Sequence, residues 1–271
     1  MLIHIIHSIQ CGGIKNDYNK YLKISSSYFY MKVNIYTITW NEEILLPYFI
    51  KFYKNHFPNI DLNFIIYDNE STDKTIEIAT NNNCIIKTFS TNNTINDIEY
   101  LNIKNNCWKN SNADWVIIVD CDEFIDIYKQ DLYKLENDKY NMVKTLGYNM
   151  INTIVDIPHT RSGARSIWYD KNALFMPKYI KEINYNPGCH YCEPIGYNIN
   201  ICTNVFKLYH FKRLSLEYYL DRIRLCRNRL SNINIAYKFG THFLASDEEH
   251  INDFNKILQE STLIIYENLF I

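Results

Sequence analysis

Residues 115–124 read WVIIVDCDEF, an apolar run that ends in three acids within four positions. The first five residues have the β-branched and aromatic character of a buried strand, and Asp120, Asp122 and Glu123 follow at once. Positions i and i+2 of an extended backbone point to the same side, so we expect Asp120 and Asp122 to be neighbours. Neighbouring carboxylates repel unless a cation lies between them, and Mg²⁺ or Mn²⁺ suits such oxygen ligands. The stretch therefore predicts a metal site at the end of a strand.

Three further strands precede this one, and a helical segment follows each of them. We expect the strands at 33–39, 63–68 and 84–89, and the helices at 47–56, 74–80 and 95–109. Such alternation is typical of an α/β fold with a mostly parallel central sheet and helices on both faces. Right-handed crossovers align the carboxyl ends of the strands along one edge, where ligands bind. This context favours the metal site over the alternative, in which Asp120 caps a turn and the other two acids are solvated.

The second half of the chain loses this alternation. Strands are expected at 142–150 and 205–211, and Ser215 caps a strongly periodic helix. Because there is neither a repeat nor a linker, we expect one domain over 31–245. Residues 1–30 are expected to form a poorly packed extension, and 246–271 a C-terminal helix that packs on the domain or on a second subunit, which leaves room for a homo-oligomer.

Charge and cysteine content narrow the class of protein. The 271 residues carry 28 basic and 30 acidic side chains, a net charge of −2 that favours no nucleic-acid partner. The eight cysteines are scattered and resemble no disulfide scaffold, which indicates an intracellular, reducing compartment. We expect no transmembrane segment, because no run is long enough to cross a bilayer. A cytoplasmic protein, able to lie peripherally on a membrane, is therefore expected.

The order of these segments resembles a known enzyme family. The shared stretches are VNIYTITWNEE, NFIIYDNESTDKT, DWVIIVDCDEF, GYNM, YDKNALF, PGCH, LYHFKRLSLEYYLDRI and RNRLSN, which span about 33–245. Together they resemble family 2-like glycosyltransferases with the single-domain GT-A fold, in a bacterial-type branch that carries a DxDEF motif. The resemblance implies a metal-dependent, inverting transfer of sugar from a nucleoside-diphosphate sugar, expected to be a UDP-sugar, to a hydroxyl of a glycan or other acceptor in glycan synthesis.

The resemblance also implies roles for residues at the donor site. Thr39 and Glu42 would contact the nucleoside, and Asp68 would bind the nucleobase. The alternative for Asp68 is that it only organises the turn that follows it. Asp120 would contact the ribose or the metal.

Metal and phosphate ligands follow from the same resemblance. Asp122 would bind the metal with Asp120, and His210 would complete the site. Lys212 and Arg213 would bind the pyrophosphate. The alternatives are a buried, satisfied His210 and a solvated helix start at Lys212.

The general base is the least defined role. Inverting transfer needs a group that takes the proton of the acceptor hydroxyl, and in the family this is an acid, commonly in an acidic pair downstream. No such pair stands at the expected place, so the candidates are Glu193, Asp170 and His190, each of which could also be an ordinary loop residue.

Two rival functions remain open. A sugar-phosphate nucleotidyltransferase would need a glycine-rich loop after the first strand, and TITWNEE contains no glycine. A non-catalytic sugar- or nucleotide-binding relative would keep the fold alone.

We expect most of the four arginines at 222, 224, 227 and 229 to lie on the surface, because they cannot share one helix face.

Overall fold

The structure is a computed structural model that describes residues 31–265. The extension predicted over 1–30 and the positions 266–271 lie outside these residues. The described chain from Lys32 onward forms one compact unit. Within it, no helix is both long and apolar enough to cross a membrane.

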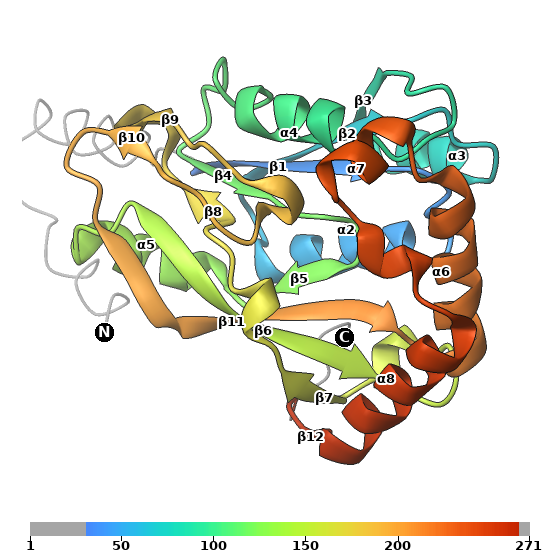
Figure 1. Cartoon of the computed structure of the whole chain (residues 1–271). Coiled ribbons are helices and arrows are strands. Elements are labelled where there is room, and N and C mark those ends of the chain that lie inside the picture. Colours follow the sequence, from blue (N-terminus) through green and yellow to red (C-terminus); the bar gives the residue numbers. More distant parts are fainter. Residues whose placement is uncertain (1–30, 266–271) are drawn as a thin grey trace, which may run out of the picture. The chain divides into compact units, whose positions relative to one another are not determined.

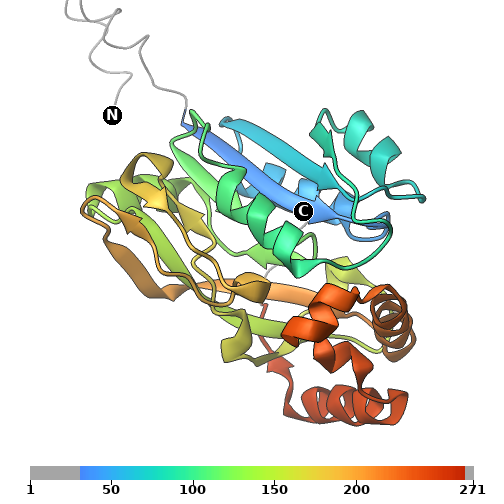
Figure 2. The ribbon, with the colours of Figure 1, turned by 45° about the horizontal axis from the view of Figure 1, so that its top comes forward.

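Four parallel strands form the first half of the central sheet, in the order β4-β1-β2-β3. They are β1 (Lys32–Thr39), β2 (Asp61–Asp68), β3 (Ile85–Thr88) and β4 (Trp115–Ile118). Helices α2 (Leu46–His56) and α4 (Asp97–Asn106) lie on opposite faces of this half, while α3 (Thr75–Asn81) connects β2 to β3 (Figures 1 and 2). The predicted α/β fold with a mainly parallel sheet and helices on both faces is confirmed.

The second half of the sheet mixes strand directions. Strands β6 (Met142–Ile151) and β11 (Ile201–Arg213) run parallel to each other. The short strand β8 (Leu174–Phe175) lies antiparallel between β6 and β4 and so joins the two halves. The remaining strands of this sheet pair antiparallel: β5 (Glu123–Ile125) with β11, β7 (Ser162–Arg165) with β6, and β12 (Thr262–Leu263) with β7. Strands β9 (Ile180–Glu182) and β10 (Ile195–Gly196) form a separate antiparallel pair.

Four helices belong to the second half of the chain: α5 (Lys129–Asn137), α6 (Leu216–Arg229), α7 (Asn232–Tyr237) and α8 (Asp247–Glu260). Ser215 caps α6, as predicted. The prediction of one helix over 246–271 is wrong in its length, because the helix ends at Glu260 and strand β12 follows. The edge of β7 offers backbone partners to Thr262 and Leu263, which stops the helix from continuing.

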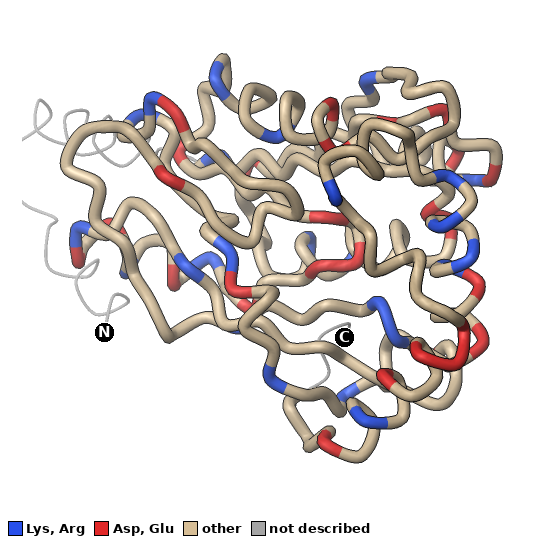
Figure 3. The backbone as a smooth tube through the Cα atoms, viewed as in Figure 1, with Lys and Arg blue, Asp and Glu red and all other residues tan. Residues whose placement is uncertain are grey.

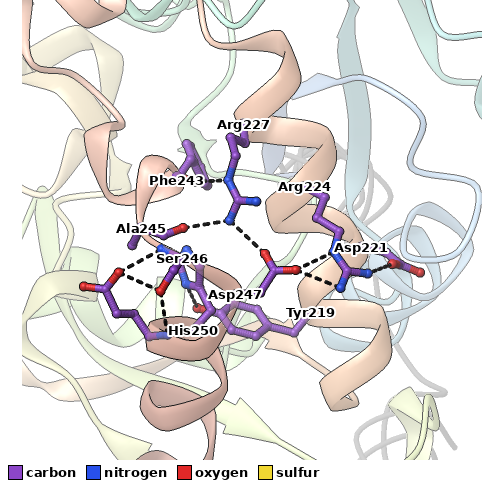
Figure 4. Close-up of polar contacts among 10 residues, drawn as sticks. Tyr219, Asp221, Arg224, Arg227, Phe243, Ala245, Ser246, Asp247 and His250 are labelled. Carbon is purple, nitrogen blue, oxygen red and sulfur yellow. Dashed lines mark hydrogen bonds and ion pairs between the residues drawn. The ribbon is translucent and has the colours of Figure 1, made fainter.

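Two arginines fasten α8 to α6. Arg227 donates to the carbonyl oxygens of Phe243 (2.9 Å) and Ala245 (2.7 Å), and its Nη2 also lies 2.9 Å from Asp247 Oδ1 (Figure 4). Arg224 pairs with the other oxygen of Asp247. These contacts hold the segment before α8 against α6.

Aromatic packing positions the strand that follows the acidic motif. Phe49 and Phe52 of α2 pack against Phe124, with ring centres 5.9 and 5.1 Å away. Tyr53 accepts a hydrogen bond from the amide of Ile125 (3.1 Å) and is fully buried. The chain just after Asp122 is therefore held by the core of the domain.

Candidate functional site

A cavity of about 280 Å³ lies at the carboxyl ends of the central strands. Its walls come from the segments that follow β1 and β4, from the end of β11, and from α4 and α6. Asp120 and Asp122 both line it. The acids thus lie at the sheet edge where the strand order predicted a ligand site.

The backbone around the acids forms a turn. The amide of Glu123 donates to the carbonyl oxygen of Asp120, and the amide of Asp120 donates to Glu123 Oε2, both at 3.0 Å. The amide of Phe211 on β11 donates to the carbonyl oxygen of Asp122 (2.7 Å). The expectation of extended backbone with side chains i and i+2 on one side is therefore wrong, although both carboxylates reach the cavity.

Two lysines neutralise Asp120. Lys104 Nζ from α4 lies 2.5 Å from Asp120 Oδ1, and Lys171 Nζ lies 3.5 Å from Oδ2 while also pairing closely with Glu123. Burial favours a higher pKa for the Asp120 carboxyl, but Lys104 and Lys171 outweigh it and hold that pKa below the usual value. The sequence analysis expected a metal ion to neutralise Asp120. In the structure two lysines, which the sequence analysis did not identify, provide positive charge next to it.

Asp122 instead meets His210. The Nε2 atom of His210 lies 3.2 Å from Asp122 Oδ2, and its Nδ1 atom lies 3.4 Å from Asn149 Oδ1. The ring of His210 stacks on Tyr169, with ring centres 3.9 Å apart. Burial favours a higher pKa for Asp122, but His210 outweighs it, so the pKa lies below the usual value.

Asp122 and His210 offer two ligands to a metal ion. Among residues 31–265, no three His, Cys, Asp or Glu side chains gather closely enough to hold one together. Mg²⁺, however, commonly binds one or two protein carboxylates and takes its other ligands from substrate phosphates and water. Asp122 and His210 fit such a partial set, whereas Asp120 is already paired with lysines.

Two cations of the cavity wall form no ion pair with an acid among the described residues. Lys212 Nζ lies 4.9 Å from the ring centre of Phe243, and burial followed by Arg213 lowers its pKa. The guanidinium of Arg229 lies 3.2 Å from the ring centre of Trp40, and its buried Nη2 has no hydrogen-bond partner in the described chain. Both arrangements leave positive charge available for an anion in the cavity.

A third cation of the wall is paired. Arg222 contacts Glu42 closely and donates to the carbonyl oxygen of Asn41 (3.1 Å). Burial raises the pKa of the Glu42 carboxyl to about 7, against the opposing effect of Arg222. The expectation that most arginines of α6 lie on the surface is wrong for Arg222 and Arg229, which line the cavity.

Other predicted ligands lie elsewhere. Arg213 is not among the residues of the cavity wall and bonds to Asn149 (2.9 Å) and Asp253 (2.5 Å). Thr39 lines the cavity, but its hydroxyl donates to Asp68 Oδ1 (3.2 Å). Asp68 Oδ2 accepts the amide of Ser71 (2.9 Å), so Asp68 organises the turn after β2, the alternative that the sequence left open.

The three candidate bases have different surroundings. Asp170 pairs with Arg165 (2.8 Å) and accepts the amide of Gly147 (2.9 Å). Glu193 is exposed and accepts from the hydroxyl of Tyr191 (3.3 Å). His190 is half-buried beside the cavity-lining residues 188 and 189, and burial followed by Lys171 lowers its pKa to about 4.

Comparison with known proteins gives structural likeness alone. No protein-family model matches the sequence, and no curated protein matches it either. Similar solved structures include S. aureus TarS (15% identity, TM-score 0.42) and its fragment 1-349 in complex with UDP-GlcNAc (14%, 0.41). The likeness covers 85% of this chain in both cases, but 43% of the first protein and 72% of the second, so the chain spans less than half of TarS.

A second similar structure is glucosyl-3-phosphoglycerate synthase from Mycobacterium tuberculosis, solved with Mn²⁺, UDP and glucosyl-3-phosphoglycerate. Its identity is 12% and its TM-score 0.31, over 51% of this chain and 50% of that one. The geometry of the cavity is therefore the evidence for a function.

Proposed function

We propose that the protein is a glycosyltransferase of the GT-A type that uses a nucleoside-diphosphate sugar. The observation that carries this is the composition of one cavity wall: the Asp122–His210 pair faces the same space as Lys212 and Arg229, two cations that form no ion pair with an acid in the described chain. A diphosphate would satisfy both cations, and Trp40 beside Arg229 offers an aromatic surface to the nucleoside.

Transfer breaks the bond between the anomeric carbon and the diphosphate, and the bonding electrons leave on the diphosphate. Lys212 and Arg229 stabilise the negative charge that develops there, and their burial strengthens this effect. Asp122 and His210 would hold a divalent ion, Mg²⁺ or Mn²⁺, which when bound supplies further neutralisation of the leaving group. Lys104 and Lys171 keep Asp120 ionised and in place, where it can accept hydrogen bonds from the donor.

Thermal unfolding tests the donor assignment. We expect UDP to raise the melting temperature of the full chain, and Mn²⁺ to increase that shift, because ligands that bind only the folded state stabilise it. GDP, dTDP and inorganic pyrophosphate serve as comparisons for the nucleoside. Arg229→Ala and Lys212→Ala should each weaken UDP binding, whereas Arg224→Ala, on the outer side of α6, should leave it unchanged. If none of the nucleotides raises the melting temperature, the proposal is contradicted.

We propose His190 as the base of an inverting reaction. It would take the proton of the acceptor hydroxyl while that oxygen forms the new bond to the anomeric carbon. Its Nδ1 is buried and has no hydrogen-bond partner among the described residues, unlike the carboxylates of Asp170 and Glu193. Because Nδ1 has no exposed surface, Nε2 is the ring nitrogen that would receive the proton.

The pH profile tests this role. A base must be neutral to act, and a pKa near 4 keeps His190 neutral from pH 7.5 down to about 5. We therefore expect kcat/KM to stay level over that range and to fall only as the pH approaches 4. An unperturbed histidine would instead halve the rate near pH 6.5. His190→Gln should lower kcat about 100-fold or more with little change in the KM for the donor. If the substitution changes only the donor KM and leaves kcat as it was, the role is excluded.

A further inference from the structure

An exposed tryptophan lies beside the proposed base. Trp168 is 71% exposed, and its neighbour Ile167 is 73% exposed. Both belong to a 3₁₀ turn, Ile167–Tyr169, in the segment between β7 and β8. Adjacent large apolar side chains that stay this exposed form an apolar patch, and such patches can mark a binding surface.

The turn that carries Trp168 is firmly anchored. Asp170 accepts the amide of Gly147 (2.9 Å), and both Arg165 (3.0 Å) and the amide of Ser166 (2.9 Å) donate to the carbonyl oxygen of Gly147. A Cβ at Gly147 would lie 2.3 Å from the Cβ of Tyr169, so only glycine allows the turn to approach β6 this closely. Trp168 therefore projects from a fixed support.

A series of rings leads from Trp168 to the metal ligands. The ring centre of Trp168 lies 6.5 Å from that of His190, which lies 5.7 Å from Tyr169. Tyr169 stacks on His210 at 3.9 Å, and His210 contacts Asp122. Ring contacts thus connect the exposed Trp168 to His210, a residue of the cavity wall.

The loop that carries His190 completes this surface. Gly188 has φ +76°, and a Cβ there would come within 2.5 Å of His190 Nε2. The imidazole can pack over the loop only because position 188 has no side chain. The glycine at 188 thus sets the position of the ring that lies 6.5 Å from Trp168.

We propose that Trp168 is the stacking platform for a sugar ring of a carbohydrate acceptor, with one hydroxyl of that sugar directed at His190. The inference rests on the proposed function and names its acceptor class. A sugar presents an apolar C–H face and a rim of hydroxyls, which matches an aromatic ring beside a single polar atom. The charges next to the platform, Arg165 and Asp170, pair with each other (2.8 Å), so the site suits a neutral sugar.

Saturation-transfer NMR on the full chain with UDP present tests the platform. The probes are the methyl glycosides of glucose, galactose, mannose and N-acetylglucosamine. We expect the ring protons of at least one glycoside to receive saturation. Trp168→Ala should weaken that binding about 5-fold, as loss of an aromatic contact predicts, whereas Trp168→Phe should restore most of it. Tyr133→Ala, which removes an exposed tyrosine of α5, is the matched control and should bind like the unaltered protein.

Three outcomes overturn the inference: no glycoside receives saturation, Trp168→Ala binds as well as the unaltered protein, or only an apolar peptide added to the same panel binds. The melting shift caused by UDP, measured on the same samples, separates the two levels of the assignment. If UDP gives no shift, the donor assignment fails. If UDP gives a shift and no glycoside binds, only the acceptor assignment fails.

Discussion

Asp122→Asn should lower sugar transfer by about 100- to 1,000-fold while leaving the fold intact. The change removes the charge that faces His210 Nε2 at 3.2 Å and keeps the size of the side chain. A preorganised electrostatic contact in an active site contributes about that factor to the rate. The fold should survive because β11 holds this residue through its carbonyl oxygen, which accepts the amide of Phe211.

Release of UDP from a UDP-sugar measures the transfer, and calorimetric titration with UDP gives a second readout. In Asp122→Asn, we expect Mn²⁺ no longer to tighten UDP binding, while binding without metal stays nearly unchanged. Full transfer by the unaltered protein in the presence of a chelator would contradict the metal assignment, because Asp122 would then act without an ion.

Asp126→Asn is the matched control, in the same segment of chain. Asp126 accepts a hydrogen bond from the hydroxyl of Tyr209 (2.7 Å) and lies 3.8 Å from His56, away from the described cavity wall. We expect it to lower the melting temperature and to leave kcat nearly unchanged. The two substitutions thus separate the chemistry of the site from the stability of the strand that carries it.

The alternation of strands and helices could be predicted because it depends on local sequence. The strand expected at 33–39 is observed as Lys32–Thr39, and the one expected at 84–89 as Ile85–Thr88. Strand β8 has two residues, too few to carry a periodic signal. Because β8 connects the two halves of the sheet, the order of strands beyond β4 could not be derived from the sequence.

The acids of the site could be predicted, but their partners could not. Asp120 and Asp122 stand in one short motif, whereas Lys104 lies on α4 and Lys171 just before β8, and only the tertiary fold brings both to Asp120. One missed signal was present in the sequence. Arg222 and Arg229 are seven positions apart, two turns of helix, so they share a face, and that face lines the cavity. The sequence could therefore predict which face of α6 lines the cavity, but not which residues lie across the cavity from that face.

Lys171→Met should destabilise the protein by about 3–5 kcal/mol, the usual cost of leaving a buried charge without its partner. Lys171 and Glu123 contact each other with side chains 3% and 1% exposed, and Lys171 also faces Asp120. Since 1 kcal/mol corresponds to about 2–4 °C for a domain of this size, the melting temperature should fall by about 6–20 °C. Denaturant unfolding followed by circular dichroism measures the free energy directly.

The double variant Lys171→Met with Glu123→Gln distinguishes a buried pair from a packing defect. Glutamine keeps an oxygen for the amide of Asp120 and removes the unpaired charge, so we expect the double variant to be more stable than Lys171→Met alone. If adding Glu123→Gln only deepens the loss, the destabilisation comes from packing around the lysine stem and not from charge.

Lys109→Met tests whether burial or contact distance decides the size of the effect. Lys109 Nζ lies 2.6 Å from Glu182 Oε2, so this ion pair is also in close contact, but its side chains are 33% and 37% exposed. Water already solvates both charges there, and such pairs contribute about 0–1 kcal/mol. We expect Lys109→Met to change the free energy of unfolding by less than about 1 kcal/mol. Equal losses for the two lysines would mean that burial does not set the size of the effect, and that the Lys171–Glu123 pair contributes no more than a solvated one.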